Sequence, residues 1–309
     1  MLQLILNPEF KVSDILTAVS IFVGIIASLY VGSGIIQQRE YADKIRSSAT
    51  GVVVNLERWK ELHLHFFKEI QEGIEKEIDG VYVTEEEKDK IRNIIWAHIS
   101  EKRAEILERI IDEQISHAYK DLYLYNPNIE ELFNDIIDKL KYIDLKIYQY
   151  LLSNLQNDIW AINNINDTND HDTDPLKNRM VLTANLMTYA YTDLINESLD
   201  PIRDEFKKMI KATDRDLFQK KIQIKNQIIL PEVPRLTIEG LECSIFGEYK
   251  EANQRFADAL DLDSNRPGLW GLIYMTQRDA KNANEAEIAF KKFTDLINVK
   301  YEIWEKHLK

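Results

Sequence analysis

The chain has 309 residues, 29% of them charged, and a formal net charge of −13 at pH 7. So acidic a chain lacks the broad basic surface that phosphate backbones require, which argues against nucleic acid as a partner. The single cysteine, Cys243, excludes a disulfide within the chain and agrees with a reducing compartment.

The first feature along the chain is an uncharged apolar run over residues 15–36, preceded by a short segment of residues 1–14. A helix over this run is about 33 Å long, enough to cross a hydrocarbon core of about 30 Å. A signal peptide is a competing interpretation, but residues 1–10 hold no Lys or Arg and no A-x-A-like cleavage site follows. A buried helix of a soluble core is the other alternative. We predict a single transmembrane helix over 15–36.

Basic residues around this helix predict its direction. Only Lys11 precedes it, whereas Arg39, Lys44 and Arg46 follow it closely. Because basic residues are retained on the cytoplasmic side, we expect residues 1–14 outside and the C-terminal body in the cytoplasm. The predicted location is the cytoplasmic (inner) membrane of a bacterium or archaeon.

Small residues recur every fourth position along one face of the predicted membrane helix. Such a face lets two helix backbones approach closely in lipid, where packing replaces the hydrophobic drive. The small-residue face therefore predicts self-association into a homo-oligomer. The alternative is that the spacing arises by chance and the helix is a passive tether. The four positions are Ser20, Gly24, Ser28 and Gly32.

Residues 37–165 have the pattern of a long-helix stalk or bundle. No proline interrupts residues 37–79, and Asp79-Gly80 is expected to end this helix. A mostly apolar seam follows the three–four spacing of a coiled coil, but flanking apolar residues such as Val53, Leu62 and Phe67 widen it as in a bundle helix. Both interpretations remain open. The seam comprises Ala42, Ile45, Ala49, Val52, Leu56, Trp59, His63, Phe66 and Ile70.

Two further helices are expected in this region. Thr84 with Glu87 forms a capping box that begins one, which ends near Asn126-Pro127. The next begins with Asn128 and Glu131 and runs to about residue 165. Its aromatic residues are expected to line a core or groove, and they are Tyr142, Tyr148, Tyr150 and Trp160.

Residues 166–174 form a predicted flexible acidic loop. Its aspartates and His171 resemble metal ligands, but the calcium-loop template fails because Asp172 stands at the glycine position and Asn178 at the glutamate position. We predict no metal site there.

A helical connector over 175–232 follows. Pro175 is expected to begin a helix ending near Leu199, Asp200-Pro201 to cap the next, and Thr213 to cap another. No stretch alternates with period two for long enough to form a sheet, so the predicted class is all-α.

A different pattern occupies residues 233–309. The first part holds small and aromatic residues at set positions, namely Gly240, Gly247, Tyr249, Ala252, Phe256 and Ala259. A weaker second copy begins at Pro267 and places Trp270, Ala286 and Phe290 at corresponding positions. Both copies resemble tetratricopeptide repeats of about 34 residues. Ser264 replaces the usual proline near the repeat end, and Lys281 replaces the turn glycine of the second copy.

The resemblance implies a protein partner bound in a concave groove, or alternatively a module that serves only for packing. About three repeats are usually needed for a stable stack, so preceding helices, such as those expected over 201–229, must cover one end. The rest of the chain resembles single-pass bacterial membrane proteins with a helical cytosolic body.

Enzyme motifs are absent from the sequence: it has no P-loop, no dinucleotide-binding glycine motif, no H-E-x-x-H and no G-x-S-x-G. We therefore predict no catalysis, no cofactor and no metal. The leading hypothesis is a membrane-anchored scaffold that recruits a partner through its repeats. The alternative is an oligomerising membrane effector of the phage-defence or toxin type, whose cytosolic body senses a signal and whose membrane helix perturbs the bilayer.

Overall fold

The computed structural model describes residues 12–77, 129–163, 174–225 and 227–308, with a few single positions between 86 and 125. The described residues form helices and no strand, which confirms the all-α class. The segment 1–11, the helix expected after Thr84, the loop 166–173 and the side chain of Trp160 lie outside the described residues. The helices are α2 (Val12–Glu77), α6 (Ile129–Asn163), α7 (Asp174–Lys211), α8 (Asp214–Phe218), α9 (Glu232–Ile245), α10 (Tyr249–Leu262), α11 (Pro267–Asp279) and α12 (Ala283–Leu308).

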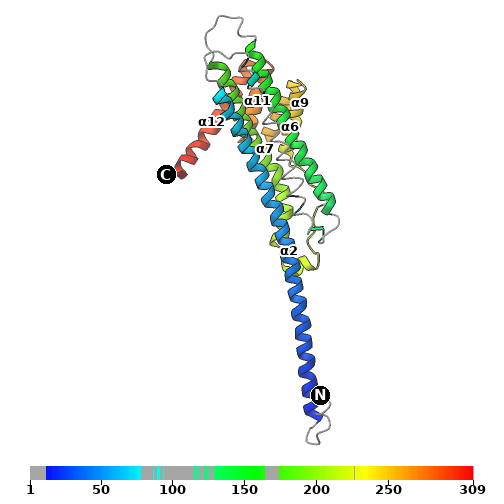
Figure 1. The fold of residues 1–309 in the computed structure, drawn as a ribbon. Helices are drawn as coiled ribbons and strands as arrows, with labels where there is room; N and C mark the ends of the chain where they lie inside the picture. Colours follow the sequence, from blue (N-terminus) through cyan, green and yellow to red (C-terminus); the bar gives the residue numbers. More distant parts are fainter. Residues whose placement is uncertain are drawn as a thin grey trace.

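Helix α2 is continuous from the apolar segment into the body of the protein (Figure 1). Its 66 residues correspond to a length of about 100 Å. Its most apolar 18-residue window has a mean hydropathy of 2.1 and is 0% buried, so this helix is long and apolar enough to cross a membrane. Helix α2 therefore continues without a break past Ile36, the predicted end of the membrane helix.

The seam of α2 is buried within its own chain. All nine seam residues are 0–1% exposed. Helix α7 runs antiparallel along α2, since Glu57 pairs with Arg203 and Phe67 packs on Tyr191 at a centroid distance of 5.0 Å. Aromatic side chains of α2 reach α6 across the core, with Phe66 and Tyr148 centroids 5.1 Å apart. Of the two interpretations of the seam, the bundle helix agrees with this packing.

The predicted break at Asp200-Pro201 is wrong, because α7 continues through Pro201. Proline lacks the N–H that would bond the carbonyl of Glu197, and an interior proline typically costs about 3 kcal/mol. Burial of Leu199 and Ile202 on either side, at 0% and 1% exposed, offsets that cost. Arg203 also donates to the carbonyl oxygen of Asn196 at 3.0 Å, a further bond to the backbone beside the interruption.

Thr213 caps α8 as predicted, since its hydroxyl accepts a hydrogen bond from the Asp216 N–H at 3.2 Å. Beyond α8 the chain is irregular through residues 219–225 and 227–231. Of the described residues in the stretch 201–229, only the end of α7 and α8 are helical. Helices α6 and α7 contact the hairpins.

Helices α9–α10 and α11–α12 form two hairpins with the same turn. The N–H of Glu248 bonds the Cys243 carbonyl at 2.8 Å, and that of Asn282 bonds the Gln277 carbonyl at 2.9 Å. Gly247 has φ +78° and Lys281 has φ +62°, and these residues are 34 positions apart. Lysine thus adopts, at some steric cost, the left-handed conformation that glycine adopts freely.

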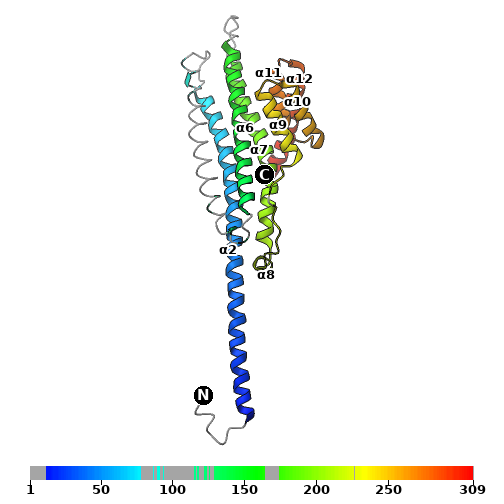
Figure 2. The same cartoon turned by 90° about the vertical axis from the view of Figure 1, so that its right-hand side faces the viewer.

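The hairpins dock on the bundle at the end away from the apolar segment (Figure 2). Helix α9 contacts α6, and α11 contacts α7. A side chain at Gly268 would meet the Ala190 Cα at 2.7 Å, and one at Gly271 would meet Leu186 at 3.0 Å. The two glycines therefore allow α11 to approach the backbone of α7 closely.

We expect the two turn positions to respond oppositely to substitution. Lys281→Gly relieves the left-handed strain and should raise the free energy of unfolding by about 1 kcal/mol, whereas Gly247→Ala should lower it by about 1–2 kcal/mol. Urea unfolding of the detergent-solubilised chain measures both. Lys250→Gly, inside α10, is the control and should be destabilising by about 1 kcal/mol. Equal losses for Lys281→Gly and Lys250→Gly would contradict the expected strain.

Candidate functional site

The apolar segment of α2 is uncovered by any other described part of the chain. Its large side chains are about half exposed or more, including Phe22 at 53% and Tyr30 at 80%. A Cβ atom added at Gly24 or Gly32 would meet nothing within 4 Å. Ser20 and Ser28 are exposed, and the Ser20 hydroxyl donates to the Thr17 carbonyl oxygen at 2.8 Å. The small-residue face is therefore open, and its self-association stays a prediction.

A buried polar cluster lies farther along the same helix. The Nδ1 of His63 is 2.7 Å from the Tyr148 hydroxyl, and its Nε2 is 3.4 Å from Oδ1 of Asp144. The Trp59 ring meets the imidazole edge to face at a centroid distance of 4.6 Å, and the Tyr191 ring packs on it in a tilted orientation at 5.4 Å. All five side chains are 0–2% exposed, so the cluster joins α2, α6 and α7 internally and offers no access to a substrate.

The sequence singled out one member of this cluster but not the contact between its members. His63 was visible as the polar member of an apolar seam. Its partners Asp144 and Tyr148 are four residues apart and share one face of α6. Nothing in the spacing along either helix indicates that these two faces meet.

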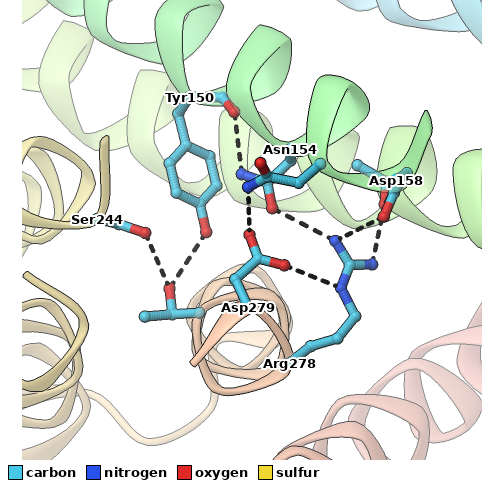
Figure 3. Close-up of polar contacts among 9 residues, drawn as sticks. Tyr150, Asn154, Asp158, Ser244, Arg278 and Asp279 are labelled. Carbon is cyan, nitrogen blue, oxygen red and sulfur yellow. Dashed lines mark hydrogen bonds and ion pairs between the residues drawn. The ribbon is translucent and has the colours of Figure 1, made fainter. Parts of the chain in front are cut away.

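A second polar cluster joins the hairpins to the bundle (Figure 3). Arg278 of α11 pairs with Asp158 of α6 at 3.1 Å and with Asp279 at 3.3 Å. The Thr183 hydroxyl of α7 donates to Oδ2 of Asp158 at 2.7 Å. Asp158 is 0% exposed and the Arg278 side chain only 10%, so the Arg278 guanidinium compensates two little-exposed carboxylates, Asp158 and Asp279.

Hydroxyl and amide groups extend this junction. The Tyr150 hydroxyl lies 3.2 Å from that of Thr276, which lies 3.5 Å from that of Ser244, and Asn157 donates to Asp279 at 3.1 Å (Figure 3). Burial, the largest cause, raises the pKa of Tyr150 to about 12. The junction thus holds neutral hydroxyls beside a compensated ion pair.

The residues expected to pack the repeats fall into two groups. Ala252, Phe256 and Ala259 are 0% exposed and Ala286 is 6% exposed, and a Cβ added at Gly240 would clash with the Phe256 ring. The other expected packing residues are Tyr249, Trp270 and Phe290, which are half-buried, and Gly247, which is exposed in its turn.

Within the described residues, the first helices of the hairpins lie against α6 and α7. The side of these helices that faces α6 and α7 carries the buried residues Leu236, Leu241, Leu269 and Met275. Helix α6 contacts α9, and α7 contacts both α9 and α11, so the bundle covers part of this face. The two roles that the repeat resemblance implies, peptide binding and packing, both stay predictions.

A small cavity lies between α7, α9 and α11. Its volume is about 10 Å³, room for about one water molecule, with Thr237 and Leu272 in its lining. Asp193 borders it and accepts a hydrogen bond from the Gly268 N–H at 2.9 Å, capping the start of α11. Arg266 pairs with Glu197 beside it. These groups compensate each other and serve the docking of α11.

Metal and thiol chemistry find little support in the part of the chain that the structure describes. No group of three or more His, Cys, Asp or Glu side chains is placed to hold a metal ion there. Cys243 is half-buried in α9, and burial raises the pKa of its thiol, which disfavours the reactive thiolate.

Comparison with known proteins finds no match to a family model, to a curated protein or to a solved structure. The repeat resemblance therefore rests on the residues and the turn geometry given above.

The junction predicts a large effect of removing Arg278. Arg278→Met leaves Asp158 buried without its cation, which typically costs about 3–5 kcal/mol, and the hairpins should become protease-sensitive. Asp158→Asn added to Arg278→Met should recover part of the loss. Urea unfolding and limited proteolysis of the full chain measure both. Arg235→Met removes an exposed ion pair of α9 and is the matched control. An Arg278→Met effect as small as that of the control would contradict the junction.

The buried position of Tyr150 leads us to predict that the folded chain loses stability at alkaline pH. Because burial raises its pKa to about 12 in the folded chain, its contribution is complete below the ordinary value of 10.0 and is lost as pH rises through about 12. Tyr150→Phe should flatten the decline over this interval, while losing about 1 kcal/mol at neutral pH with its hydroxyl contact. Urea unfolding at several pH values tests this. The half-exposed Tyr189→Phe should keep the original slope, and identical slopes for both variants would refute the prediction.

Proposed function

We propose that this protein is a single-pass protein of the cytoplasmic membrane whose helical body, in the cytoplasm, controls the membrane helix. The observation that carries the proposal is the continuity of α2. One helix supplies both the apolar segment, 0% buried, and the core seam, 0–1% exposed. A passive tether needs no such continuity and commonly uses a flexible linker.

The buried seam supports control because it holds α2 at a defined rotation. Each helical residue turns by about 100°, so the small-residue face has a defined direction relative to α7. The His63 contacts and the Glu57–Arg203 pair oppose rotation of α2 within the bundle. A rearrangement of the body would therefore rotate or shift the small-residue face in the lipid.

The resulting activity is that of an oligomerising membrane effector. Copies would associate through Ser20, Gly24, Ser28 and Gly32, and a change in the body would alter that association and perturb the bilayer. The open small-residue face supports this step. The proposal assigns the protein no catalytic group, cofactor or metal.

A membrane-anchored scaffold is the second candidate. The shared turns of the hairpins, 34 residues apart, favour true repeats of the tetratricopeptide type. Because α6 and α7 cover the first helices, a protein partner would use the outward surface instead. Exposed apolar side chains there include Phe246 at 76%, Leu262 at 57% and Ile288 at 53%.

Alanine insertions after Gln37 test the effector proposal. Two alanines rotate the small-residue face by about 200° relative to the body, and four rotate it by about 400°, close to its original direction. In bacterial cells expressing the full chain, we expect membrane depolarisation from the wild type and the four-alanine variant and little from the two-alanine variant. A potential-sensitive dye measures it, and membrane fractions check equal insertion.

Gly24→Leu is a second test variant in the same assay, because its side chain blocks the approach of two helix backbones. Val23→Leu is the control for added bulk. The first should reduce depolarisation and the second should not. Equal depolarisation from all variants would make the helix a tether. Absence of depolarisation from the wild type would overturn the effector proposal and leave the scaffold.

A further inference from the structure

The end of the body nearest the apolar segment is built from three separate stretches of the chain. Helix α8 and the end of α7 lie beside α2 at this end (Figures 1 and 2). The Tyr41 and Phe218 rings meet edge to face at a centroid distance of 5.9 Å. Arg46 donates to the Ala212 carbonyl oxygen at 2.8 Å. These contacts hold α8 against the first turns of α2 that follow the apolar run.

The depth of this end places it at the lipid headgroups. Tyr41 is five residues beyond Ile36, which is about 7–8 Å along the helix. The headgroup layer on each side of the hydrocarbon core is about 5–8 Å thick. Phe218, 44% exposed, therefore lies at the outer edge of that layer, where aromatic side chains are favoured.

Two segments at this end carry a charge opposite in sign to that of the whole protein. Residues 37–46 and 204–225 together hold ten basic and six acidic side chains, a local charge of +4 in a chain of −13. Asp214 pairs with Arg46, and Glu205 pairs with Lys208 and Lys225, so several of the acids are neutralised internally.

Among the residues that the structure describes, five exposed cations have no acidic partner in ion-pair distance. They belong to α2, α7, α8 and the residues that follow α8, and anionic groups outside the protein could pair with them. They are Lys44, Lys211, Arg215, Lys220 and Lys221.

We propose that residues 39–46 and 211–225 form a membrane collar that binds the headgroups of anionic phospholipids in the cytoplasmic leaflet. The inference rests on the membrane anchoring of the proposed function. Each cation held near an anionic surface typically raises affinity about fivefold, within a screening length of about 8 Å. The collar fixes α8 to the bilayer, so the body is held both by the membrane helix and by the leaflet beside it.

A quenching experiment on the full chain tests the collar. Gln219→Cys in a Cys243→Ser background carries a fluorophore on the exposed residue that follows α8. The protein is reconstituted in vesicles of phosphatidylcholine, with or without about one third phosphatidylglycerol, both containing a nitroxide-headgroup lipid. We expect quenching to rise about twofold with the anionic lipid and to return to its lower value in about 0.5 M salt.

Neutralising variants identify the cations responsible. Arg215→Gln/Lys220→Gln/Lys221→Gln should lose the increase with phosphatidylglycerol. Lys250→Gln/Lys291→Gln/Lys292→Gln, on the exposed surfaces of α10 and α12, is matched in charge and should keep it. Circular dichroism verifies equal helix content in both.

Flotation of the same vesicles separates the two possible failures. If the chain does not float with phosphatidylcholine vesicles, the membrane anchoring itself is wrong. If it floats but quenching is equal in the two lipids, anchoring stands and the collar proposal is overturned. The collar proposal would also be overturned if quenching rose fully with phosphatidylglycerol in the variant with three neutralised collar cations.

Discussion

The rest of the structure depends on the burial of one helical seam. The nine seam residues of α2 are removed from water against α7 and the aromatic side chains of α6, and that same helix carries the apolar segment. Burying a large apolar side chain typically contributes about 1.5–3 kcal/mol, so a seam with Trp59, Phe66 and several aliphatic residues holds α2 strongly. The helix that carries the apolar segment is consequently a structural member of the body and not an attachment to it.

The hairpins are joined to this core by a different kind of contact. Close backbone packing at Gly268 and Gly271 is combined with the buried pair of Arg278 and Asp158. A buried ion pair adds little net stability, but it penalises every other register in which a charge loses its partner. The junction therefore specifies how the hairpins sit against α6 and α7.

The local charge beside the apolar segment differs in sign from the net charge of the protein. The chain as a whole is acidic, yet residues 37–46 and 204–225 beside the apolar segment together hold more basic than acidic side chains, and several of their acids pair internally. Since electrostatic attraction is screened over about 8 Å, a membrane surface responds to this local arrangement and not to the net charge of −13.

The sequence by itself determined the helices and their buried faces. The three–four spacing predicted all nine buried seam residues, and Thr213 predicted the start of α8, because periodicity and caps are local properties of one helix. Tertiary structure decided which helix covers each face. It joined His63 to Asp144 and Tyr148, filled the inner side of the hairpins with α6 and α7, and kept α7 helical through Pro201. A helix pattern records that a face is buried, but its partner depends on the free energy of packing the whole chain.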